Sequence, residues 1–97
     1  MKQKELTAAL ENLLAIAIPL CDEECKLGPH WLSELSLSSL DRLRDLVDAS
    51  RSGELAVGSA FSLYDELGKS WVDLESEVYE LVQDIDQQFF VAPRGPN

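Results

Sequence analysis

Apolar residues recur every three or four positions along most of the chain, which is the spacing of an amphipathic α-helix. The pattern is most regular between residues 70 and 90, where these residues follow one another: Trp71, Leu74, Val78, Leu81, Ile85 and Phe89. Ser70 occupies an N-cap position, with Asp73 three residues later as in a capping box. The pattern therefore predicts one continuous last helix, which stops before Pro93.

The first third of the chain predicts another helix over about residues 2–18. Pro19 should end or kink it, because proline lacks the backbone N–H and clashes with the preceding turn. One or two more helical turns then extend to Leu27, and the Gly28–Pro29 pair forms a strong break. Pro29 can open the next helical piece, since proline is favoured in the first turn of a helix.

The middle of the chain predicts a helix over about residues 39–50. Ser38 and Asp41 have the spacing of a capping box, and Gly53 fits the stop. Helical spacing also runs through residues 54–67, although Gly58 weakens its first half, and Gly68 closes it. With no strand alternation anywhere, the chain is expected to be all-α.

Taken together, these elements predict a compact bundle of four to five short helices. Residues 1–92 should form a single helical domain, and residues 93–97, rich in proline and glycine, should form a disordered C-terminal tail. Phe89 and Phe90 are adjacent on the last helix, so one of the two rings is expected outside the core. That ring would cap the bundle or be available for a homodimer.

Acidic residues strongly outnumber basic ones in this chain of 97 residues, giving a formal net charge of −10. Residues 1–52 hold nine acids and six bases, a net −3, whereas residues 53–97 hold nine acids and two bases, a net −7. Contacts with DNA, RNA or an anionic membrane need Lys and Arg, so these direct ligands are disfavoured. A basic macromolecular partner is favoured instead.

Carboxylates form a column on the predicted last helix: Asp73, Glu77, Glu80 and Asp84. At 100° per residue the four fall within about 60° of arc, away from the apolar face. No base occurs between Lys69 and Arg94 to neutralise them. We expect this column to be a partner-binding site, with Glu75 and the exposed ring of Tyr79 as further contact residues. An ordinary solvated helix face is the alternative.

A second column, Asp41, Asp45 and Asp48, has a simpler interpretation. Arg44 follows Asp41 by three positions, and Arg51 follows Asp48 by three. Such pairs are neighbours on a helix surface and attract each other. We therefore expect this column to be structural.

Residues suited to metal or covalent chemistry are few. Cys21, Cys25 and His30 give a C-x3-C-x4-H pattern, which is an incomplete ligand set for a structural zinc site. His30 is the single histidine of the chain and has no triad around it. We expect no catalytic residues, no metal and no cofactor, and therefore a protein that is not an enzyme.

The beginning of the chain resembles a signal peptide only superficially. Lys2 and Lys4 precede an apolar run, but Glu11 and Asn12 interrupt it and no small-residue cleavage site follows. No stretch reaches the roughly 20 apolar residues of a membrane span. With two cysteines and no signal, the protein is expected in the reducing cytoplasm.

A short, acidic, helical, cysteine-poor protein with an unneutralised carboxylate stripe resembles the phage-encoded anti-CRISPR and anti-restriction inhibitors. The resemblance implies that the protein, in the cytoplasm of the host cell, occupies a basic nucleic-acid-binding surface of a protein or ribonucleoprotein complex. A mimic of nucleic acid would act in this way. The alternative is a helical oligomerisation or adaptor module, or an antitoxin-like regulatory partner, that binds through apolar surface while the acids only confer solubility.

Overall fold

Two long helices and three shorter ones make up the computed structural model, which describes residues 2–91. They are α1 (Lys2–Leu27), α2 (His30–Ser52), α3 (Leu63–Leu67), α4 (Lys69–Leu74) and α5 (Ser76–Phe89). Within these residues the β-structure amounts to an isolated bridge between Ala60 and Val91. The predicted all-α bundle of four to five helices is therefore confirmed. The tail predicted for residues 93–97 lies outside the described part.

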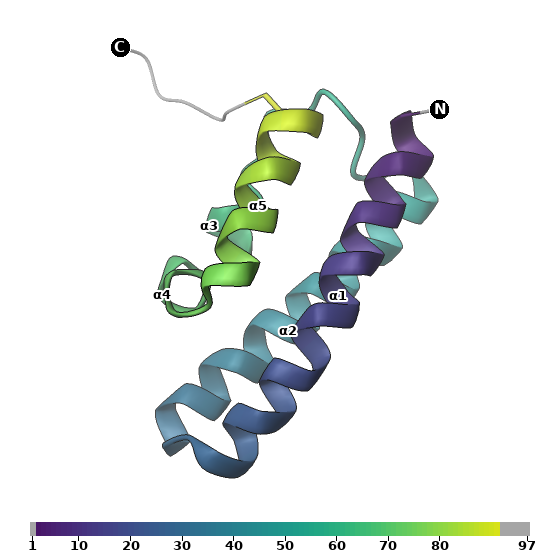
Figure 1. The fold of residues 1–97 in the computed structure, drawn as a ribbon. Helices are drawn as coiled ribbons and strands as arrows, with labels where there is room; N and C mark the ends of the chain where they lie inside the picture. The colour runs from purple at the N-terminus through teal and green to yellow at the C-terminus, as the bar shows by residue number, and fades with distance from the viewer. Residues whose placement is uncertain (1, 92–97) are drawn as a thin grey trace.

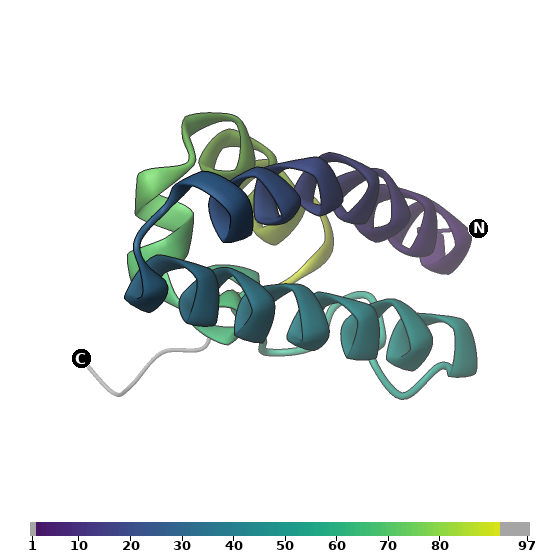
Figure 2. The same cartoon turned by 90° about the horizontal axis from the view of Figure 1, so that it is seen from below.

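The helices form two layers. Helices α1 and α2 lie antiparallel as a hairpin, and α3, α4 and α5 pack across one side of it (Figures 1 and 2). Helix α5 runs antiparallel to α1, and α3 rests against α2 and α5 (Figure 1). The molecule is consequently flat, with extents of 39 × 32 × 19 Å.

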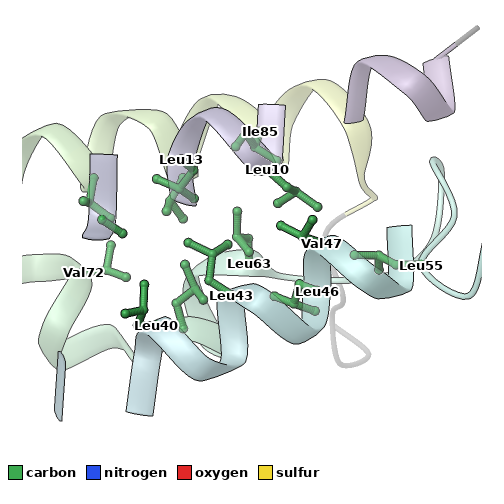
Figure 3. Packing of buried hydrophobic residues seen from close by; sticks show 14 of the residues in the cluster. Leu10, Leu13, Leu40, Leu43, Leu46, Val47, Leu55, Leu63, Val72 and Ile85 are labelled. Atoms are coloured by element: carbon green, nitrogen blue, oxygen red, sulfur yellow. The ribbon is translucent and has the colours of Figure 1, made fainter. Parts of the chain in front are cut away.

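The core lies between the two layers and draws leucine and valine side chains from every helix (Figure 3). Leu10 and Leu13 of α1 face Leu43 and Val47 of α2, and Ile85 reaches the same cluster from α5. The buried positions of α1 and α2 recur at three- and four-residue intervals, as expected for helices that bury one face. Burial of this apolar surface is the main force that holds the layers together.

Helix α1 continues through Pro19 to Leu27, so of the two effects predicted for Pro19, an end or a kink, the end of the helix is wrong. Pro19 is exposed, whereas Ala17 and Cys21 on either side of it are buried. Packing of this buried face against α2 outweighs the missing hydrogen bond on the solvent side. The predicted break at Gly28–Pro29 is confirmed, because α1 ends at Leu27 and α2 begins at His30.

Replacing Pro19 with alanine should stabilise the fold by about 1–2 kcal/mol. Proline inside a helix costs about 3 kcal/mol relative to alanine, and part of that gain is offset because proline also restricts the unfolded chain. The side chain is exposed, so no packing is lost. Urea denaturation monitored by circular dichroism measures the difference; an unchanged or lower midpoint would show that α1 gains nothing from the restored N–H.

Helix α2 is one continuous element from His30 to Ser52, whereas the sequence predicted two pieces with a capping box at Ser38. Two buried serines explain why the helix does not stop there. The Ser36 hydroxyl donates to the Glu24 carboxylate of α1, and the Ser39 hydroxyl donates to the Leu67 carbonyl oxygen at 2.6 Å. The serines therefore join α2 to its neighbours instead of capping it. Gly53 ends α2 as predicted, with a φ of 88°.

Residues 54–62 form a non-helical connection of bends and turns, so the predicted helix over 54–67 shrinks to α3. Side chains and distant backbone satisfy the polar groups of this connection. The Gln3 amide donates to the Leu55 carbonyl oxygen at 2.9 Å and accepts from the Val57 N–H at 3.2 Å. The Gly58 N–H donates to the Phe89 carbonyl oxygen at 2.7 Å. These long-range bonds replace the local bonds of a helix.

The continuous last helix predicted from residue 70 is interrupted at Glu75, whose φ of −113° and ψ of 95° are not helical. Helix α4 starts at Lys69, so Ser70 is not the N-cap. Helix α4 buries two adjacent side chains, Trp71 and Val72. Leu74, which the sequence pattern placed on the apolar face of one continuous helix, is 54% exposed.

Phe89 and Phe90 are both buried, so the expectation that one ring lies outside the core is wrong. The helix ends at Phe89, and Phe90 has extended backbone angles. Leaving the helix redirects the Phe90 ring toward Phe61, with ring centroids 4.8 Å apart. The Phe61–Phe90 pair closes the end of the core. Because neither Phe89 nor Phe90 is exposed, neither ring is available to form a homodimer in the way the sequence suggested.

Candidate functional site

Three of the four carboxylates of the predicted column share the solvent face of α5: Glu77, Glu80 and Asp84. All three side chains are exposed, and the opposite face of the helix is buried in the core. Within residues 2–91, no ion pair involves any of them. Neighbouring carboxylates at this spacing lie ~5–6 Å apart and repel each other. They form a line of uncompensated negative charge, here called the α5 acidic face.

Asp73 does not belong to this line, which corrects the prediction. It lies on α4, beyond the break at Glu75, and accepts a hydrogen bond from the Tyr64 hydroxyl at 2.7 Å. Tyr64 in turn meets Tyr79 of α5 edge to face, with ring centroids 6.0 Å apart. Tyr79 points roughly 160° around α5 from Glu77. Asp73 and Tyr79 therefore form a second cluster, on the flank of α5 that faces α3.

The hydrogen bond to Asp73, followed by burial and by the negative charge of Asp73, raises the pKa of Tyr64 to about 12. An acid whose pKa is raised by folding stabilises the fold below its ordinary value, near 10, and loses that contribution as the pH rises through the folded value. The bond should therefore persist at neutral pH and fail in strong alkali.

Replacing Asp73 with asparagine should return the Tyr64 pKa toward 10, because the carboxylate that holds the hydroxyl proton is gone. Tyrosine ring carbon resonances followed by NMR across alkaline pH measure this midpoint. Glu80→Gln is the matched control, since it removes a charge from the α5 acidic face without touching Tyr64. An equal shift in both variants would mean that general charge, and not the Asp73 bond, sets the pKa.

Glu75 lies apart from both clusters. It forms the junction between α4 and α5, is half-buried, and lines a surface hollow with Glu23, Glu24 and Leu27 at the end of α1. The structure thus distributes the six predicted contact residues over three places: the α5 acidic face, the Asp73–Tyr79 cluster and this hollow.

Asp86 has a role that the sequence did not indicate. Its carboxylate accepts from the backbone N–H groups of Leu63 at 2.7 Å and Tyr64 at 3.2 Å, so α5 caps the first turn of α3. Burial raises the pKa of Asp86, against the two backbone hydrogen bonds, which lower it. A cap supplied from more than 20 residues away leaves no local pattern, and so no signal in the sequence identified it.

The second acidic column is largely neutralised, as the sequence predicted. Arg44 lies 3.8 Å from Asp41, and Arg51 lies 3.6 Å from Asp48. Arg51 also pairs with Glu11 of α1. Two of the three carboxylates in this column therefore have an ion-pair partner, whereas none of the three on the α5 acidic face has one within residues 2–91.

The three residues considered for zinc have separate environments. Cys21 is buried and donates to the Ser36 carbonyl oxygen at 3.4 Å. Burial, and then the nearby Glu24, raises its pKa to about 11, which disfavours the thiolate that a metal would need. Cys25 is exposed, and the exposed His30 lies 3.0 Å from Glu34. The prediction of no metal and no cofactor stays a prediction.

Comparisons of the chain with known protein families, with curated proteins and with solved structures give no significant match. Among the described residues, 2–91, no helix is long and apolar enough to cross a lipid bilayer.

Proposed function

We propose that this protein is a small acidic inhibitor that binds a basic nucleic-acid-binding surface of a protein or ribonucleoprotein complex. It works by occupancy and not as an enzyme, in the manner of the anti-CRISPR inhibitors that its sequence resembles. The observation that carries the proposal is the α5 acidic face: Glu77, Glu80 and Asp84 are exposed and side by side. Within residues 2–91 they have no ion-pair partner.

Electrostatics supports this partner class. A groove that binds DNA or RNA is lined with Lys and Arg. Binding there is favoured because these side chains release the counterions condensed on the phosphate chain. A rigid helix that presents carboxylates ~5–6 Å apart offers a similar line of negative charge. The net −7 of residues 53–97 adds a long-range field that steers the protein toward a basic surface. Competition with nucleic acid would then be steric and electrostatic.

One observation favours an adaptor module as the second candidate. Several large apolar side chains are exposed, including Leu27 at 80%, Trp31 at 60% and Leu74 at 54%. An oligomerisation or antitoxin-like partner would bind such residues through apolar contact, and the acids would then serve solubility.

Competition by nucleic acid separates the two candidates. The immobilised protein is exposed to an extract of its native host, and the bound fraction is challenged with double-stranded oligonucleotide. An inhibitor of the proposed kind releases its partner to the oligonucleotide and to salt, because both compete for the same basic surface. Retention of the partner through both washes would replace this proposal with the adaptor function.

A further inference from the structure

The closed end of the α1–α2 hairpin projects beyond the second layer of helices (Figure 1). Its last turns are therefore not fully covered by α4. Leu27 and Trp31, on either side of the Gly28–Pro29 turn, are 80% and 60% exposed. Leu74, at the end of α4, is 54% exposed. Exposed large apolar residues indicate an interaction surface where they adjoin a shaped hollow, whereas isolated ones do not, and of these three residues Leu27 lines such a hollow.

A hollow lies between this end of the hairpin and the junction of α4 with α5. Its lining residues are Leu20, Glu23, Glu24, Leu27, Gly28 and Glu75. Two leucines thus stand beside three carboxylates. We call the surface formed by these six lining residues the hairpin-end surface.

Glu24 is held in a fixed position within the hollow. The Ser36 hydroxyl and the Trp71 indole N–H, the latter at 3.2 Å, both donate to its Oε1 atom. An ionised carboxylate accepts at both oxygens, so Oε2 retains capacity for a donor from a ligand. Trp71 is fully buried, which anchors the arrangement to the core.

Negative charge dominates the surroundings of the hollow. Segment 20–35 together with Glu75 contains five carboxylates and one lysine. That lysine, Lys26, is already paired with Asp22 at 3.0 Å. Two like-charged copies of this chain, or an anionic membrane, would be repelled here. A partner with positive charge and apolar side chains complements both properties of the surface.

We infer that the hairpin-end surface binds a basic amphipathic segment of a partner protein. The arginine or lysine heads of the segment meet Glu23, Glu24 and Glu75, and its apolar side chains lie on Leu20 and Leu27. Charge and apolar contact act together at this surface, in contrast to the α5 acidic face, where charge alone is presented. The inference is independent of the proposed inhibitor function, because the two surfaces share no residue.

A synthetic helical peptide with leucines along one face and arginines along the other is a suitable probe. It is titrated into the isotope-labelled whole protein, and backbone amide shifts are followed by NMR. We expect the shift changes to fall on residues 20–31 and 74–76. Leu27→Ser and the pair Glu23→Gln with Glu75→Gln should each weaken binding about tenfold. Leu37→Ser, at an exposed leucine of α2 that does not line the hollow, is the matched control and should have no effect.

Four outcomes would overturn the inference. Shifts concentrated on Glu77, Glu80 and Asp84 would place peptide binding on the α5 acidic face. Equal binding of a peptide with serines in place of leucines would leave no role for apolar contact, and equal binding of one with glutamates in place of arginines would leave none for charge. Absence of measurable binding at millimolar peptide would exclude the surface as a site of this kind.

Discussion

Replacing Trp71 with alanine should lower the free energy of unfolding by about 3–5 kcal/mol, which is a large part of what holds a small domain folded. Trp71 is fully buried where α4 meets the hairpin, and its indole N–H donates to Glu24 at 3.2 Å. Truncation leaves a cavity and removes one donor from a carboxylate that is partly withdrawn from water. Thermal and urea denaturation measure the loss.

Two substitutions make this prediction specific. Trp71→Phe keeps most of the apolar contact and loses the N–H, so it should cost only about 1–2 kcal/mol. Trp31→Ala removes the other tryptophan, which is 60% exposed, and should change stability by about 0.5 kcal/mol or less. Equal losses at residues 71 and 31 would contradict the position assigned to α4.

The sequence predicted the helical class and most of the glycine boundaries, because these depend on local properties. Gly53 and Gly68 end helices where expected, each with a φ near 90°. Gly28–Pro29 likewise marks the turn of the hairpin. Glycine ends a helix because it readily adopts positive φ, and proline weakens one because it lacks the backbone N–H. Both effects are local and do not depend on how the helices pack.

The errors arose where tertiary contacts outweighed local pattern. Ser36 and Ser39 pair with groups of other helices, so α2 does not stop near Ser38. The connection at 54–62 is satisfied by Gln3 and by the end of α5, so it does not need to be helical. Neither set of partners is visible in the sequence of the segment itself.

The candidate site was predicted in part for the same reason. Glu77, Glu80 and Asp84 lie within one helix, so the 3.6-residue period was enough to place them on one face. The predicted position of Asp73 on that face required a single helix through residue 75, but the helix is interrupted at Glu75. The hydrogen bond that Asp73 accepts from Tyr64, a residue of a different helix, could not be predicted from the spacing of residues along the chain.

The second large effect concerns binding by the α5 acidic face. The triple-amide variant, Glu77→Gln with Glu80→Gln and Asp84→Asn, keeps shape and removes three charges. We expect it to bind the partner about 100-fold more weakly or worse, a loss of roughly 2.7 kcal/mol or more, because charge pairs across an interface contribute on this scale. Isothermal titration calorimetry with the purified partner measures the change.

Folding of this variant should be nearly unchanged. Two repulsive pairs, Glu77 with Glu80 and Glu80 with Asp84, are relieved, for a gain of about 0.2–0.5 kcal/mol each. Glu77 lies in the first turn of α5, where a negative charge is favourable by about 0.3–1 kcal/mol, so its loss offsets that gain. The matched control is the amide triple at Asp41, Asp45 and Asp48. It should bind as the unmodified protein does, because Arg44 and Arg51 already pair with two of the three carboxylates of that column.

The dependence of partner affinity on salt, measured for the unmodified protein and the triple-amide variant together, tests the central claim most directly. Binding to a basic nucleic-acid-binding surface predicts that the affinity of the unmodified protein falls at least tenfold between about 50 and 200 mM salt. The variant should bind weakly throughout, with a shallower slope. Equal affinities that are insensitive to salt in both proteins would contradict the claim and leave the α5 acidic face as a solvated helix surface.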